Sequence, residues 1–162
     1  MERWILYLHL ASVLGFMLAH GVQVQVMWRL HGEPDPARIE WLFHPLPSTR
    51  LLQVLLAAII VTGLIAGFIV PWWRQWWIWV SLALLLGITW AMRRYGAGYL
   101  ELIERPTMEL IEAMSAGADA AELAAKRAAF DRARLSWYPA GMTVIGLGGL
   151  AIILWLMVFK PF

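Results

Sequence analysis

The chain of 162 residues is 61% apolar and only 15% charged. Soluble globular domains carry roughly 25% charged residues, and here the few charges stand in blocks between long uncharged runs, which indicates a protein embedded in a lipid bilayer. The lack of cysteine excludes disulfides, iron–sulfur clusters, thiolate zinc sites and covalently attached haem. The net charge of +2 is too small to indicate that the protein binds nucleic acid.

Four stretches are long and apolar enough to span a bilayer, which requires about 20 residues. They cover residues 4–28, 51–70, 76–92 and 140–159. Pro71 follows the second stretch, and Pro139 precedes the fourth, where a proline in the first helical turn costs little. The first stretch is too long for a cleaved signal peptide and is expected to be an uncleaved anchor. We therefore predict an all-α polytopic membrane protein, a four-transmembrane-helix bundle that forms a single membrane domain over residues 1–162.

The basic residues predict the orientation of this bundle. Segments 29–50 and 93–138 carry ten Lys and Arg residues, whereas the N-terminus, the 71–75 turn and the C-terminus carry three. Because cytoplasmic loops are enriched in Lys and Arg, we predict a multi-pass protein of the bacterial cytoplasmic (inner) membrane with both termini periplasmic. The tryptophans are interpreted mainly as anchors at the two membrane surfaces. The outer group is Trp4, Trp72, Trp73, Trp76, Trp77 and Trp155, and the inner group is Trp28, Trp41, Trp90 and Trp137.

Segment 93–138 is the only part with a soluble-looking composition and is predicted to be a cytoplasmic helical loop. Residues 93–105 are expected to prolong the third helix until Pro106 stops it. Thr107 is then expected to cap a short helix that ends at Gly117. This segment is expected to be an amphipathic connector packed on its own protein.

A second helix is predicted after Gly117. Asp119 and Glu122 have the spacing of a capping box. The pairs Glu122–Lys126 and Arg127–Asp131 have the i,i+4 spacing of helical ion pairs. The recurring apolar residues that give this helix one apolar edge are Leu123, Phe130 and Trp137.

Ionisable residues inside a bilayer are costly and mark functional sites. All eleven carboxylates lie outside the predicted spans, which argues against a carboxylate-coupled transporter and a di-iron carboxylate site. The four histidines are at positions 9, 20, 31 and 44. Because eleven residues make three helical turns plus about 20°, His9, His20 and His31 are expected on one face of the first helix.

Two intramembrane histidines on one helical face are typical of helix-bundle cytochromes that hold b-type haem. We therefore predict His9 and His20 as haem or metal ligands, with haem b as the cofactor of a redox, electron-transfer or tetrapyrrole-handling protein. His44 is the nearest candidate for a second haem ligand, provided that its loop enters the inner leaflet. The other choices are Met142, Met157, no second ligand, or a histidine from a second subunit in a homodimer or larger membrane complex.

Three alternatives stay open. In the first, His9 and His20 are neutral interhelical residues without a cofactor. Their hydrogen-bond partners would then be Ser12, Gln23, Thr62 or Thr143. In the second, the protein is a non-catalytic membrane anchor or scaffold whose 93–138 segment docks a partner. In the third, it handles copper, although its eight methionines are not clustered.

The second span contains a GxxxG motif, Gly63-Leu-Ile-Ala-Gly67. Glycines at this spacing let two membrane helices approach closely. They also leave room for a flat macrocycle, but close packing is the favoured interpretation.

The opening Tyr7-Leu8-His9-Leu10, followed by Gly15 in the first of four spans, resembles small bacterial membrane proteins of the copper-resistance D-like type. It is also similar to the membrane protoporphyrinogen oxidase that binds haem b. The closing segment, residues 154–162, resembles that of a group of small predicted integral membrane proteins. The resemblance implies His9 as the haem or metal ligand. The first span ends in Met27-Trp28-Arg29-Leu30 and lacks the proline–arginine segment of the oxidase, so haem contact is implied more than oxidase catalysis.

Overall fold

The computed structural model describes residues 2–43, 48–69 and 72–161, and within these residues it contains helices and short connections but no strand. The all-α prediction is thereby confirmed. The chain divides into two compact units. The first unit comprises residues 1–23, 47–87 and 149–162, and the second comprises residues 24–46 and 88–148.

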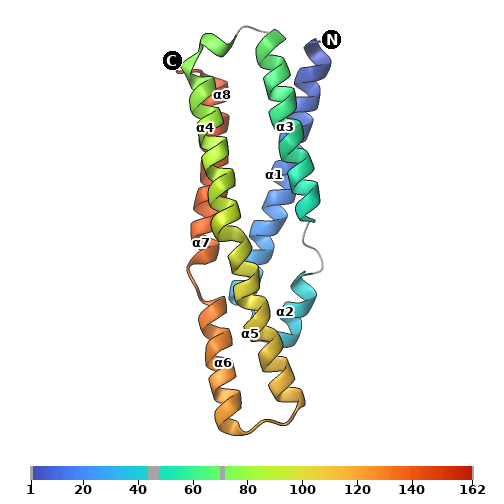
Figure 1. Ribbon diagram of the computed structural model, residues 1–162, viewed down its shortest axis with the longest axis vertical. Helices are drawn as coiled ribbons and strands as arrows, with labels where there is room; N and C mark the ends of the chain where they lie inside the picture. Colours follow the sequence, from blue (N-terminus) through green and yellow to red (C-terminus); the bar gives the residue numbers. More distant parts are fainter. Residues whose placement is uncertain (1, 44–47, 70–71, 162) are drawn as a thin grey trace. The chain divides into compact units, whose positions relative to one another are not determined.

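Eight α-helices are described along the chain (Figure 1). They are α1 (Glu2–Gly32), α2 (Pro36–Phe43), α3 (Thr49–Ile69), α4 (Trp76–Ala91), α5 (Ala97–Ser115), α6 (Ala120–Arg134), α7 (Tyr138–Thr143) and α8 (Gly149–Phe159). A 3₁₀ turn, η1 (Trp72–Arg74), precedes α4, and π-helical stretches η2 (Met92–Gly96) and η3 (Val144–Gly148) follow α4 and α7. Pro139 lies in the first turn of α7, as predicted for the start of the last span.

Four helical stretches among the described residues are long and apolar enough to cross a membrane. They are Arg3–Gly32, Arg50–Ile69, Trp76–Ser115 and Ala120–Phe159. Each corresponds to one predicted span, so this part of the prediction is confirmed. The last two are 40 residues long, about twice what a bilayer requires. Their charged parts, within residues 93–138, therefore extend beyond the apolar spans.

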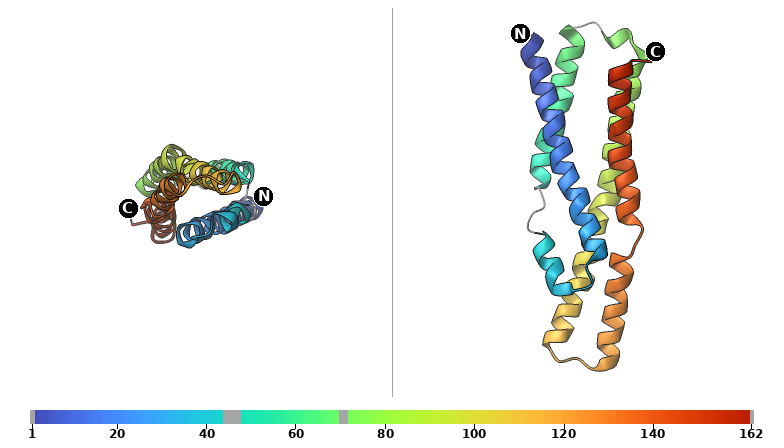
Figure 2. Two further views of the ribbon diagram at one scale, coloured as in Figure 1. Left: turned by 90° about the horizontal axis from the view of Figure 1, so that it is seen from below. Right: turned by 180° about the vertical axis from the view of Figure 1, so that it is seen from behind.

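In the first unit, α1 lies beside α3, and α4 lies beside α8 (Figures 1 and 2). Gly15 permits a close approach of α1 to α3, because a Cβ atom at this position would lie 3.3 Å from Leu55 Cδ2. Large apolar side chains cover the outside of the unit, and Leu18 and Phe68 are 74% and 78% exposed. Contiguous apolar surface of this kind suits lipid better than water.

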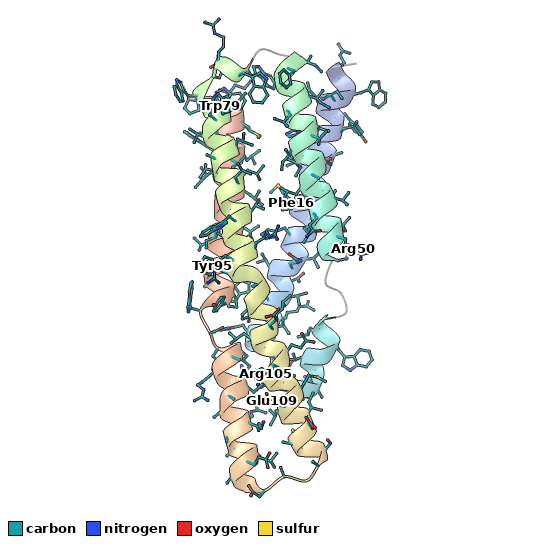
Figure 3. All side chains as sticks on the ribbon, in the orientation of Figure 1. Phe16, Arg50, Trp79, Tyr95, Arg105 and Glu109 are labelled. Carbon is teal, nitrogen blue, oxygen red and sulfur yellow. The ribbon has the colours of Figure 1, made fainter. Side chains whose placement is uncertain are left out.

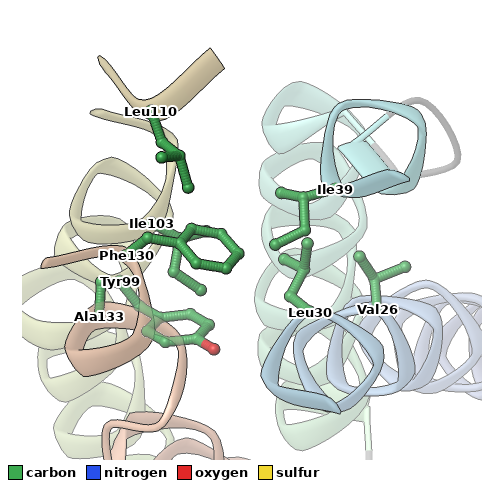
Figure 4. Packing of buried hydrophobic residues seen from close by; sticks show 8 residues of the cluster. All are labelled: Val26, Leu30, Ile39, Tyr99, Ile103, Leu110, Phe130 and Ala133. Carbon is green, nitrogen blue, oxygen red and sulfur yellow. The ribbon is translucent and has the colours of Figure 1, made fainter. Parts of the chain in front are cut away.

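The second unit is held together by a core of buried apolar side chains (Figure 4). They belong to α1, α2, α5 and α6 and are Val26, Leu30, Ile39, Tyr99, Ile103, Leu110, Phe130 and Ala133. Figure 4 shows Leu30 and Ile39 on the side opposite Ile103 and Phe130. Full burial of an apolar side chain contributes about 1.5–3 kcal/mol, so this core stabilises the α5–α6 hairpin against α2 and the end of α1.

The prediction that Pro106 ends the third helix is wrong. The helix continues through the π-helical stretch Met92–Gly96 into α5, and Pro106 lies inside α5. Thr107 is therefore not a cap; its side chain is buried, and its hydroxyl donates to the Ile103 carbonyl at 2.7 Å. The buried side chains of Ile103 and Leu110, on either side of the proline, provide packing energy that offsets the lost backbone hydrogen bond.

The connection between α5 and α6 follows the predicted signals. α5 ends at Ser115, and Gly117 has a φ of 68°, a left-handed conformation that favours glycine after a helix. Asp119 caps α6, because its Oδ1 atom accepts a hydrogen bond from the Glu122 backbone N–H at 2.8 Å. The short turn makes α5 and α6 antiparallel neighbours.

The predicted apolar edge of α6 is confirmed only in part. Phe130 is completely buried, and Leu123 is half-buried, but Trp137 is 70% exposed. Trp137 leaves this edge because α6 ends at Arg134, before the third position of the seven-residue repeat. The predicted ion pair between Arg127 and Asp131 is present at 3.3 Å.

Lys126 bonds to a partner other than the predicted Glu122. Its Nζ atom donates to Glu109 Oε2 on α5 at 2.9 Å, because the antiparallel hairpin brings Glu109 opposite α6. Arg105, one turn before Glu109 (Figure 3), donates from Nε to Glu109 Oε1 at 3.0 Å. The hydrogen bond from Lys126, followed by that from Arg105, holds the pKa of the Glu109 carboxyl below its usual value. Glu109 in turn raises the pKa of Lys126.

Candidate functional site

The first unit contains an open apolar cavity of about 300 Å³. This volume is at the lower end of the roughly 300–1,000 Å³ of small-molecule and cofactor sites. The lining comes from α1, α3, η1, α4 and α8 and extends on α1 from Leu6 to Met17, a rise of about 16 Å. Of the described residues that line the cavity, Lys160 carries the only full charge.

His9 lines this cavity from α1 and is hydrogen-bonded to α3. Its Nδ1 atom lies 3.0 Å from Thr62 Oγ1. The Thr62 hydroxyl donates its single proton to the Ala58 carbonyl of its own helix. Thr62 Oγ1 can therefore only accept a hydrogen bond from His9. Thr62 Oγ1 also lies 3.3 Å from the Ile59 carbonyl, a second acceptor for the same hydroxyl proton. We infer that Nδ1 carries the imidazole proton and that Nε2 keeps its lone pair.

The GxxxG glycines of α3 lie directly under two cavity side chains. A Cβ atom at Gly63 would lie 3.2 Å from His9 Cε1, and one at Gly67 would lie 2.9 Å from the Trp73 ring. Both distances are shorter than ordinary carbon–carbon contacts of about 3.5–4.0 Å. The favoured interpretation of this motif as a close-packing device is consistent with these distances, and the packed groups are the rings of His9 and Trp73.

His20 lies on α1, eleven residues or about 16.5 Å beyond His9. It is not among the described residues that line the cavity, and its ring stacks on Phe16 at 5.9 Å with an interplanar angle of 10°. Phe16 itself lines the cavity and is labelled in Figure 3. His20 Nε2 is buried and has no hydrogen-bond partner within the described part of the chain. The structure therefore places His9 at the cavity and His20 beside it.

The other predicted ligands are divided between the two units. Met157 of α8 lines the same cavity as His9, whereas Met142 is buried in the second unit. His31 also belongs to the second unit, with its ring 5.7 Å from that of Trp28. His44 lies outside the described residues. Residues 2–43, 48–69 and 72–161 contain no group of three or more His, Asp or Glu that could hold a metal ion.

Three cavity residues were not recognised as site residues from the sequence. Trp73 and Trp77 were interpreted as membrane anchors, yet both line the cavity, and Trp77 is only 5% exposed. Ser81 also lines it and is only 4% exposed. The sequence feature that could have identified this site is Ser81 itself, because it is a polar residue between Val80 and Leu82 in an otherwise apolar run.

Comparisons of the chain with protein-family models, curated proteins and solved structures found no match. Within the described residues, the fold and the site define an all-helical protein with four helices long and apolar enough to cross a membrane, and with a histidine at an apolar cavity.

Proposed function

We propose that this protein is a multi-pass protein of the bacterial cytoplasmic membrane that binds a b-type haem through His9. Its role would be electron transfer or tetrapyrrole handling at the membrane. The observation that carries the proposal is the hydrogen bond of 3.0 Å between His9 Nδ1 and Thr62 Oγ1. It leaves Nε2 as the ligand nitrogen in an apolar cavity, and imidazole nitrogen is a usual axial ligand of haem iron.

The residues present fit haem better than a bare metal ion. A porphyrin supplies four of the iron ligands, so the protein needs to add only one or two, whereas a copper or zinc site requires several protein side chains. The described residues offer no group of three such ligands apart from thioethers. Met157 lines the cavity together with His9 and is the residue of this unit best placed to serve as a second ligand.

Thr62, which is bonded to His9, and three residues that line the cavity have defined tasks in this proposal. Thr62 fixes the orientation and the tautomer of His9, as second-shell partners of metal-bound histidines do. Phe16 and Trp77 contribute apolar surface that excludes water. Met157 also lines the cavity and, as a second ligand, would raise the reduction potential of the haem. A bound b-type haem would supply one-electron chemistry.

The topology in this proposal follows the distribution of charge. The ten basic residues of segments 29–50 and 93–138 support a cytoplasmic position for both segments and a periplasmic position for both termini. His9 then lies in the outer half of the bilayer. Segment 93–138, with the α5–α6 hairpin, lies in the cytoplasm as the soluble part of a four-helix membrane protein.

The test is spectroscopic. The protein is expressed with ample haem and purified in detergent, and reduced-minus-oxidised spectra are recorded for the wild type and for the variants His9→Leu and His20→Leu. We expect a Soret band in the wild type that His9→Leu abolishes and His20→Leu retains. A wild-type protein without a Soret band would overturn the proposal.

A further inference from the structure

The hydroxyl of Ser81 differs from those of Ser12 and Thr62 in the same unit. Ser12 and Thr62 each donate to the backbone carbonyl one turn earlier in their own helix. Ser81 Oγ has no hydrogen-bond partner among the described residues, although the residue is only 4% exposed. A buried polar group without a partner is disfavoured, and Ser81 is one of the residues that line the cavity.

The indole of Trp73 is a second unpaired donor at the same cavity. Trp79 donates from Nε1 to the Trp73 carbonyl at 3.0 Å, but Trp73 Nε1 is buried and unpaired within the described part of the chain. The Trp73 ring packs directly on Gly67. Trp73 therefore lines the cavity with an indole N–H that has no partner among the described residues.

Lys160 adds a positive charge to these two donors. Its ammonium lies over the rings of Trp72 and Trp77, at 5.0 Å and 5.6 Å from their centroids. Both tryptophans and Lys160 line the cavity, and no Asp or Glu is found among the described lining residues. The residues of η1, α4 and the chain after α8 that line the cavity thus include two unpaired donors and one cation, and the described ones include no carboxylate.

We propose that Trp73 Nε1, Ser81 Oγ and Lys160 Nζ form a subsite for the oxygen acceptors of a flat apolar ligand, namely the two propionate carboxylates of the tetrapyrrole. This inference rests on the proposed haem function and adds an orientation to it. A carboxylate accepts several hydrogen bonds and is stabilised by a cation. The ligand is bound with its carboxylates toward the tryptophan-rich side, while His9 supplies the nitrogen ligand from α1.

The test compares haem b with its dimethyl ester, in which both carboxylates are blocked and uncharged. Purified protein freed of haem is titrated with each compound, and the dissociation constants are obtained from the Soret absorbance. We expect the wild type to bind haem b about tenfold more tightly than the ester. Lys160→Met removes this preference, and Ser81→Ala weakens haem b binding severalfold. The matched control is Arg74→Met, because Arg74 is an exposed cation of η1 that does not line the cavity.

The outcomes separate the subsite from the haem proposal. Equal dissociation constants for the two compounds, unchanged in Lys160→Met, would overturn the carboxylate subsite and leave His9 ligation standing. A wild type that gives no Soret band with either compound would overturn both. Binding of a short-chain benzoquinone, measured by tryptophan fluorescence, without binding of haem b would also overturn both and would assign the donors to a neutral carbonyl ligand.

Discussion

Gly67→Ala is the most direct test of the packing that shapes the cavity. The added Cβ atom would lie 2.9 Å from Cε2 and Cζ2 of the Trp73 ring. The ring must therefore retreat by about 0.5 Å or more to reach a normal contact. Overpacking of this kind costs typically about 1–3 kcal/mol. Replacing glycine by alanine inside a helix stabilises it by about 0.5–1 kcal/mol, so we expect a net loss of roughly 0–2.5 kcal/mol.

Gly87→Ala in α4 is the matched control, because no atom lies within 4 Å of a Cβ placed at Gly87. The two variants share the same gain in helix propensity, so the difference between them isolates the clash with Trp73. A difference of about 1–3 kcal/mol corresponds to roughly 2–12 °C in Tm for a chain of this size. Thermal unfolding in detergent, followed by circular dichroism, measures it. A Gly67→Ala protein as stable as Gly87→Ala would refute the packing of Trp73 on α3.

Three further predictions concern other parts of the molecule. Thr62→Val removes the acceptor of His9 Nδ1 and should weaken haem binding about 10- to 100-fold, measured by Soret titration. Phe130→Ala empties a completely buried position and should destabilise the second unit by about 3–5 kcal/mol, seen as faster hydrogen exchange in α5 and α6. The ion pair of Glu109 with Lys126 stabilises the hairpin above the ordinary carboxyl pKa of 4.5. Because the folded pKa is lower, this stability should be lost as pH falls through the folded value, and limited proteolysis of the hairpin should accelerate there.

Each of these predictions has a control. Ser12→Ala removes a hydroxyl of α1 that bonds to its own helix, and it should leave haem affinity unchanged. Leu135→Ala changes a side chain that is 56% exposed and should cost less than Phe130→Ala by several-fold. Glu109→Gln should abolish the acid sensitivity of the hairpin. Glu104 is an exposed residue of the same helix, and the Glu104→Gln variant should keep this acid sensitivity. If Glu109→Gln kept the full pH dependence, another carboxylate would be responsible.

The spanning helices could be predicted from the sequence because their signal is local. A run of about 20 apolar residues is sufficient to identify such a helix, and the four runs recur in α1, α3, α4 and the 138–159 stretch. The effect of Pro106 could not be predicted, because the lost backbone hydrogen bond is a local cost that the sequence shows. The packing that offsets it is made by Ile103 and Leu110 of α5 against residues of other helices. The partner of Lys126 was missed for the same reason, since Glu109 precedes it by 17 residues.

The candidate site was only partly predictable. His9 stood out because an ionisable residue in an apolar span is rare, and Thr62 was one of its four predicted hydrogen-bond partners. Ser81 and Trp73 could not be recognised, because a single serine and an interfacial tryptophan are common in membrane helices. Ser81 and Trp73 differ from other serines and tryptophans of membrane helices in having unpaired polar atoms and lining one cavity. Both features depend on how four helices and η1 pack around the cavity.

The central claim, that His9 supplies a nitrogen ligand to haem, is tested most directly by removing the imidazole and returning it from solution. The Soret band is measured for the wild type, for His9→Gly, and for His9→Gly with added imidazole. We expect the band in the wild type, its loss in the variant, and its recovery as free imidazole fills the space left by the side chain. A wild type without the band, or a variant that keeps it unchanged without imidazole, would contradict the claim.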